Sequence, residues 1–128
     1  KMKEFFDKNI RKEAINNKYF RKVLNTGKNA QLVVMSLKPK EEIGTEVHKK
    51  YDQILVNVKG NGYCVLDGKK MKFEKDSLVY VPKGTWHNFV NSGKEDLKLF
   101  TIYSPPNHPP GTIHRTKKDA QKAESGEK

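Results

Sequence analysis

The feature of this chain that most restricts its fold is a series of short apolar runs separated by turns. Each run spans only a few residues and is rich in β-branched and aromatic side chains. Glycine-bearing turns lie between the runs, such as 60–62 and 91–93. Many short strands at regular spacing are typical of an all-β sandwich or barrel. The predicted strands are 22–24, 31–37, 53–58, 63–66, 71–73, 78–81, 87–90 and 97–103.

Short helices are expected on both sides of these strands. Residues 7–17 predict a helix with Asp7 as its N-cap, because the apolar residues of this segment fall on one face. Residues 116–124 predict a second, frayed helix within a flexible tail, 116–128. The clearest hairpin is centred on Asp67-Gly68, since both residue types tolerate positive φ.

A proline-rich segment, 104–115, follows the last predicted strand. Its four prolines argue against regular ladder pairing and predict an extended strap, acting as a lid or as an arm that clasps a dimer. The 128 residues then form a single domain, 1–128, with a barrel core of about 20–104, the strap 104–115 and the tail.

The formal net charge of +11 raises the question of nucleic acid. Arginine, the preferred bidentate ligand of phosphate and guanine, is scarce, and the lysines are scattered along the chain. We therefore predict a solvated lysine-rich surface and no nucleic-acid partner. The charge would instead draw small anionic molecules toward a cleft.

The same sequence predicts a cytoplasmic protein without a membrane partner. No apolar run approaches the roughly 20 residues that span a bilayer. Residues 1–11 lack the apolar core and cleavage site of a signal peptide. The single cysteine, Cys64, lies in an apolar strand pattern and is expected to be a buried structural thiol in a reducing compartment.

Two histidines, a glutamate and a glutamine are spaced for metal binding. Glu46 and His48 are two residues apart, so both side chains point to the same face of a strand. If Gln53 lies on an adjacent antiparallel strand, it converges with them and with His87 inside a barrel. Such a set suits a divalent first-row metal, although a histidine on an apolar strand is more often a hydrogen-bonded core residue. A register slipped by one residue would place Asp52 at the metal and turn Gln53 outward.

The residues around His87 resemble the second motif of the cupin family. That motif places proline, glycine, histidine and asparagine at fixed intervals, and Pro82, Gly84, His87 and Asn91 stand in that register. Asp76 stands where the motif has its leading glycine, a tolerable change at a turn.

The first cupin motif is present as a variant. The family has a glycine, two histidines one residue apart, a glutamate and a closing glycine, and the chain has Gly44, Glu46, His48, Gln53 and Gly60. Glutamate thus replaces a histidine, and glutamine replaces the glutamate. The resemblance covers 31–104. It implies a cupin double-stranded β-helix, a jelly-roll barrel, with short N-terminal and C-terminal helices.

The resemblance also implies one divalent transition-metal ion, either iron, manganese, zinc or nickel. Glu46, His48 and His87 would form a two-histidine, one-carboxylate set. Gln53 would be a weak fourth ligand or would hydrogen-bond a bound water or substrate.

Five further residues are candidates for lining a substrate pocket, with packing as the alternative for each. Tyr51, Asp52 and Trp86 are expected near the mouth of the site, and Tyr103 points inward by the alternation of its strand. His108 lies on the strap, as does His114, and a loop over the barrel mouth would bring one of them close.

The implied function is a metal-dependent enzyme acting on a small polar or anionic, sugar-like molecule, as in the sugar-phosphate isomerase-like cupins. The alternative is a non-catalytic module that binds or senses a small ligand or metal, because no acid–base pair is evident. Cupins commonly form homodimers through a sheet face. Both faces of strand 53–58 are partly apolar, which fits a homodimer here.

Overall fold

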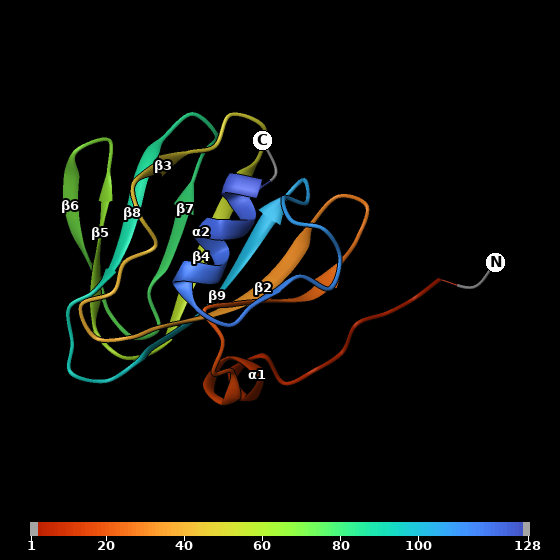
Figure 1. The fold of residues 1–128 in the computed structure, drawn as a ribbon, viewed down its shortest axis with the longest axis horizontal. Coiled ribbons are helices and arrows are strands. Elements are labelled where there is room, and N and C mark those ends of the chain that lie inside the picture. Colours follow the sequence, from red (N-terminus) through yellow and green to blue (C-terminus); the bar gives the residue numbers. More distant parts are fainter. Residues whose placement is uncertain (1–2, 127–128) are drawn as a thin grey trace.

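The structure, a computed structural model, describes residues 3–126 and has the expected jelly-roll architecture. Two antiparallel sheets face one another (Figure 1). The larger has the strand order β10-β1-β2-β9-β4-β7, and the smaller has the order β3-β8-β5-β6. The strands are β1 Arg21–Thr26, β2 Gln31–Leu37, β3 Glu46–Val47, β4 Asp52–Lys59, β5 Gly62–Leu66, β6 Lys69–Phe73, β7 Leu78–Val81, β8 Trp86–Asn91, β9 Leu97–Ser104 and β10 Ile113–His114.

The core lies between the two sheets. Met35 and Leu55 from the larger sheet pack with Phe73 and Phe89 from the smaller one, and all four are fully buried. Cys64 is also buried in this core, and burial raises the pKa of its thiol, so it is the structural cysteine that was predicted. Because successive side chains of a strand point to opposite faces, Val33 and Met35 of β2 enter this core, whereas Val34 faces the other side of the sheet.

The turns adopt the conformations that their residues favour. Asp67 and Gly68 both have positive φ, 47° and 82°, which confirms the predicted hairpin between β5 and β6. Asp76, which replaces the leading glycine of the second motif, has a φ of 70°, a conformation that aspartate adopts more readily than most residues. At Gly60, with a φ of 102°, a Cβ atom would lie 2.9 Å from the carbonyl oxygen of Asp96. This closing glycine of the first motif therefore tolerates no side chain.

The N-terminal helix α1, Ile10–Asn16, is shorter than predicted. Its N-cap is Asn9, whose side chain accepts a hydrogen bond from the backbone N–H of Lys12, so the assignment of Asp7 was wrong. The helix packs through Ala14 on the outer face of the larger sheet, against Val34 and Val58. Residues 3–9 extend away from the barrel (Figure 1).

The segment after β9 is more regular than its prolines suggested. Ile113 and His114 form β10, which pairs with Lys22 and Arg21 of β1. Helix α2, Lys117–Gly126, includes the predicted helix 116–124 and occupies most of the expected tail, while 127–128 lie outside the described residues. Ala120 of α2 is buried against the core cluster. Neither helix within residues 3–126 is long and apolar enough to cross a membrane.

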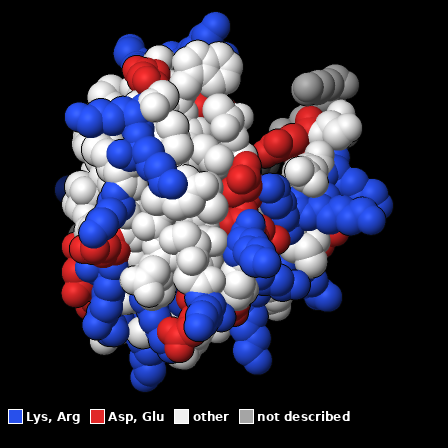
Figure 2. All heavy atoms as spheres, turned by 90° about the vertical axis from the view of Figure 1, so that its left-hand side faces the viewer, with Lys and Arg blue, Asp and Glu red and all other residues white. Residues whose placement is uncertain are grey.

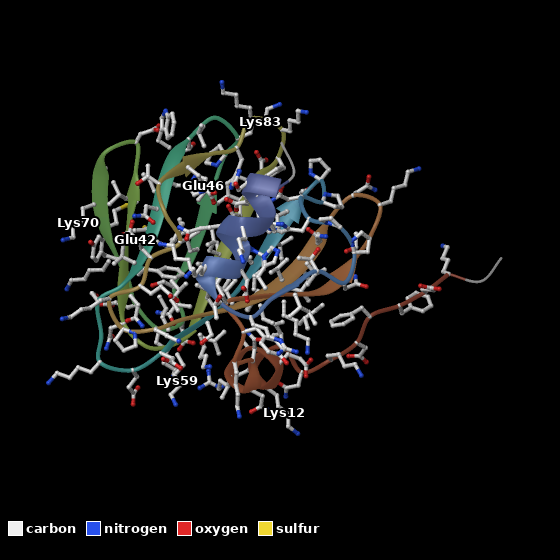
Figure 3. All side chains as sticks on the ribbon, viewed as in Figure 1. Lys12, Glu42, Glu46, Lys59, Lys70 and Lys83 are labelled. Atoms are coloured by element: carbon white, nitrogen blue, oxygen red, sulfur yellow. The ribbon has the colours of Figure 1, made fainter. Side chains whose placement is uncertain are left out.

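Charged side chains are dispersed on the face drawn in Figure 2. Lysines and arginines lie around its rim, interspersed with acidic residues, and uncharged residues occupy much of its middle (Figure 2). Lys12, Lys59, Lys70 and Lys83 project outward from the periphery (Figure 3). This arrangement fits the predicted solvated lysine surface.

Candidate metal centre

Three side chains with metal-ligating atoms meet where β3 and β8 pair. Glu46 lies directly opposite His87 in this ladder, and His48 follows β3 immediately. The Oε1 atom of Glu46 lies 3.1 Å from Nε2 of His48 and 3.7 Å from Nε2 of His87. The ligand atoms of the three residues all lie within 4.8 Å of one another. Two ligands at about 2.1 Å from one ion are separated by roughly 3–4 Å, so the two distances from Glu46 suit a common metal ion.

His87 presents an unused nitrogen to this cluster. Its Nδ1 atom lies 2.8 Å from the carbonyl oxygen of Thr85 and must donate there, because a carbonyl only accepts. In the neutral ring, Nε2 then carries a lone pair. This atom is buried and has no hydrogen-bond partner among residues 3–126. A buried imidazole nitrogen held in this way fits a metal ligand.

His48 is oriented by Tyr51. The Nδ1 atom of His48 lies 2.6 Å from the hydroxyl oxygen of Tyr51, and the two rings pack with centroids 4.4 Å apart. If Nε2 binds a cation, Nδ1 keeps the proton and donates it to the Tyr51 oxygen. The Tyr51 hydroxyl stays protonated, because burial raises its pKa further above the usual value.

Glu46 is the anionic member of the cluster. Burial by itself would raise the pKa of its carboxyl, but the interactions with His48 and His87 outweigh that effect and lower the pKa to about 2. The pKa of His87 is raised in turn, since the effect of Glu46 and the Thr85 carbonyl exceeds the opposing effect of burial. The Glu46 side chain, labelled in Figure 3, shares cavity walls with residues of α2.

The expectation that Gln53 lies on a strand adjacent to Glu46 and His48 was wrong. Gln53 belongs to β4 of the larger sheet, whereas β3 belongs to the smaller sheet. The side chain is nevertheless buried inside the barrel, where Nε2 donates to the Thr101 hydroxyl at 3.0 Å. Its Oε1 atom has no hydrogen-bond partner in the described part of the chain. Gln53 thus presents an unused acceptor within the barrel.

Asp52 and Trp86 point away from this interior, which corrects their assignment as pocket-lining residues. The Asp52 carboxylate accepts hydrogen bonds from the Tyr80 hydroxyl and from the backbone N–H of Lys83. Trp86 is 56% exposed, whereas its neighbour His87 is 2% exposed. Each lies one residue from an inward-facing side chain, so the alternation of the strand turns it outward.

The cluster opens into a cavity of about 230 Å³. Glu46 and His48 form part of its wall, and three of the predicted lining residues, Tyr51, Tyr103 and His108, also border it. The complete lining is Arg21, Glu46, His48, Tyr51, Tyr103, Asn107, His108, Pro109, His114, Ala123 and Glu124. The barrel, the strap and α2 therefore all contribute to one cavity.

Gln31 holds the strap over this cavity. Its Nε2 atom donates to the carbonyl oxygen of His108 at 2.7 Å, and its Oε1 atom accepts from the backbone N–H groups of Asn107 and His108. The strap places the His108 ring next to Tyr103, with centroids 5.3 Å apart. Burial, together with the positive charge of Arg21, lowers the pKa of His108 to about 3.

Three polar residues of the cavity escaped the sequence analysis: Arg21, Asn107 and Glu124. For Arg21 the only signal was its alternation with Val23 at the start of a strand. Asn107 and Glu124 gave no signal, because they reach the cavity through the path of the strap and the packing of α2.

Comparison with known proteins agrees with the fold and with the two motifs. The family model described as a cupin domain matches residues 33–103. The Bacillus subtilis protein YrkC is 45% identical over 122 residues, and the mimivirus protein L612 is 43% identical over 123 residues. The alignments cover 91% and 92% of this chain, but only 66% of YrkC and 73% of L612.

A crystal structure of a similar protein has the same fold. The Bacillus halodurans protein BH2720 superposes with a TM-score of 0.90 at 38% identity, covering 91% of this chain and 93% of that one. The family match, the fold and the motif residues agree: the chain belongs to the cupin superfamily.

Proposed function

We propose that Glu46, His48 and His87 bind one divalent transition-metal ion, with Gln53 as a further ligand or as a hydrogen-bond partner of a bound molecule. The observation that carries this proposal is the pair of unsatisfied buried atoms, Nε2 of His87 and Oε1 of Gln53. Leaving such atoms unpaired costs about 1–3 kcal/mol each, and a bound cation or its ligand would remove that cost.

The donor set of two imidazoles and one carboxylate suits iron, manganese, zinc or nickel. A metal bound there would polarise a carbonyl group or activate water or dioxygen. The chain's own residues would position the reactants. Tyr51 orients His48, the Thr85 carbonyl sets the tautomer of His87, and strap residues form part of the cavity wall.

We propose that the protein is a metal-dependent enzyme acting on a small polar or anionic molecule, in the manner of the isomerase-like cupins. The polar cavity beside the cluster supports a small-molecule substrate. The alternative is a non-catalytic binding or sensing module. Azide or nitric oxide binding to the metal-loaded protein would reveal an open coordination position and favour the enzyme, whereas a closed metal would favour the module.

We also propose a cytoplasmic homodimer. The buried, unpaired Cys64 thiol suits a reducing compartment. On the outer face of the larger sheet, Leu78 and Tyr80 are 61% and 51% exposed and lie beside Val56 and Ile54 in the β4–β7 ladder. This apolar strip would be covered by the same strip of a second copy.

Elemental analysis of purified protein, with equilibrium metal titration, tests the metal site. We expect one metal ion per chain, and a loss of more than about 100-fold in affinity in His48→Ala and His87→Ala. Asp52→Asn serves as the control, because Asp52 lies next to Gln53 but faces outward, and it should bind metal as the wild type does. Folding of each variant is checked by circular dichroism. Failure of the wild type to retain iron, manganese, zinc or nickel would refute the proposed ligand set.

A further inference from the structure

Arg21 is a buried cation that lacks an acidic partner. It lies on β1, is 4% exposed and borders the same cavity as Glu46 and His48. Its Nη1 atom lies 3.1 Å from Nδ1 of His114, and its guanidinium carbon lies 5.3 Å from the centre of the Phe20 ring. Within residues 3–126, no carboxylate forms an ion pair with it, and its Nε atom has no hydrogen-bond partner. A buried charge without a counter-ion is costly, so this arrangement calls for a compensating anion.

In the described part of the chain no carboxylate lies within ion-pair distance of Arg21; Glu46 and Glu124 border the same cavity without contacting it in this way. A guanidinium only donates, so Nδ1 of His114 accepts from it and His114 offers no negative charge. His108 is held as a neutral ring. Of the residues described along the cavity wall, Arg21 is the only lysine or arginine. The guanidinium of Arg21 is therefore a single fixed positive charge in a polar cavity. Glu46 and His48 of the candidate metal centre border the same cavity.

We propose that Arg21 binds the carboxylate of a small organic acid that occupies this cavity. The other end of the same molecule, a hydroxyl or carbonyl oxygen, lies toward Glu46 and His48; this second half of the inference rests on the proposed metal-dependent function. The planar guanidinium fork matches a carboxylate, and one positive charge matches a monoanion. Glu46 and Glu124 border the cavity and repel a doubly charged phosphate more strongly than a carboxylate.

The size of the cavity limits the acid. Its volume of about 230 Å³ lies below the roughly 300–1,000 Å³ of sites for drug-sized ligands. Short hydroxy or keto acids fit this limit. Specificity would come from the distance between the guanidinium and the metal cluster, because a ligand must reach both.

The test uses lactate and inorganic phosphate as probes on the full chain. The metal-free protein is titrated with each probe while the arginine Nε–H signals are followed by nuclear magnetic resonance, and affinities are measured by calorimetry. We expect lactate to shift the Arg21 signal in a saturable way. Arg21→Lys should weaken lactate binding by about tenfold or more, since charge-assisted bidentate hydrogen bonds are lost. Arg115→Lys, at an exposed arginine, should bind lactate as the wild type does.

Several outcomes would overturn the inference. Equal lactate affinities in wild type, Arg21→Lys and Arg115→Lys would remove Arg21 from the site. Tighter binding of phosphate than of lactate would show that the class of anion is wrong. If Arg21→Lys does not fold, the test uses the Arg21 Nε–H signal of the wild type alone. A signal that does not shift when lactate is added refutes the proposal.

A parallel titration of zinc-loaded protein separates this inference from the proposed function. Lactate binding that appears only with zinc, and that Arg21→Lys does not weaken, would place the carboxylate on the metal and refute the role of Arg21. If the chain binds no metal, the proposed function fails, but the metal-free titration still tests Arg21.

Discussion

His108 illustrates how one side chain acquires its properties from the residues packed around it. The ring lies on the strap, beside Tyr103 and His114. Burial, and after it the positive charge of Arg21, disfavours its protonation, and the opposing effect of Glu46 is smaller. The pKa therefore falls from 6.5 to about 3. The site thus contains a neutral imidazole near neutral pH.

This shift predicts a pH-dependent stability. Between pH 6.5 and 3 the unfolded chain binds a proton at His108 that the folded chain does not. The free energy of unfolding should therefore fall as the pH is lowered through this range, by up to about 1.4 kcal/mol per pH unit. His108→Asn removes this contribution, because asparagine does not titrate. Urea denaturation of metal-free wild type and variant should give a difference that is constant above pH 6.5 and slopes below it. Parallel curves down to pH 3 would contradict the shift.

The strap is the element that turns an open barrel end into a cavity. It has few regular backbone pairings, so side-chain hydrogen bonds from Gln31 on β2 hold it in place. Gln31 is 1% exposed, and each of its polar atoms is used. The position of His108 and Asn107 in the cavity thus depends on one residue of the barrel wall.

Gln31→Leu should loosen the strap without disrupting the barrel. The backbone N–H groups of Asn107 and His108 lose their acceptor, and each unsatisfied group costs about 1–3 kcal/mol. Hydrogen exchange at these two amides should accelerate at least about tenfold, while the amides of β9 within the sheet keep their protection. Ser104→Ala is the control, because its hydroxyl makes one exposed hydrogen bond, to the Asn29 carbonyl. Uniform acceleration throughout the barrel would mean that Gln31 supports the whole core and not the strap.

At the scale of the whole molecule, the outer face of the larger sheet is only partly covered. Helix α1 covers part of the larger sheet, through Ala14. The strip formed by Leu78, Tyr80, Ile54 and Val56 lies at the β4–β7 edge of the same sheet. Large exposed apolar residues that lie side by side are typical of an interface.

The homodimer proposal therefore predicts a charge-sensitive interface. Leu78→Glu places a carboxylate in the strip, and its copy in a twofold dimer lies nearby, so the dimer should dissociate. Light scattering after gel filtration should report the mass of two chains for the wild type and of one chain, 14.7 kDa, for the variant. Trp86→Glu, a change at a comparably exposed residue of the smaller sheet, should leave the dimer intact. A wild type that elutes as one chain at all concentrations would refute the proposal.

The sequence by itself determined the local features of the protein. The period of two in runs such as 97–103 predicts which side chains enter the barrel, and Asp67-Gly68 predicts a tight hairpin; both are properties of a few neighbouring residues. The interval from Pro82 to Asn91 identified the family, because this motif is contiguous in the chain.

Only the tertiary structure decided how distant segments meet. The structure places Gln53 in the sheet opposite Glu46 and pairs β10 with β1. It also places Arg21 in the wall of a cavity that the strap and α2 complete. No short-range pattern encodes these contacts, since they arise from the packing of two sheets around one core and from hydrogen bonds such as that between Gln31 and His108. Alternation along a strand determines whether a side chain faces the barrel interior. The closure of the barrel determines which residues that side chain contacts.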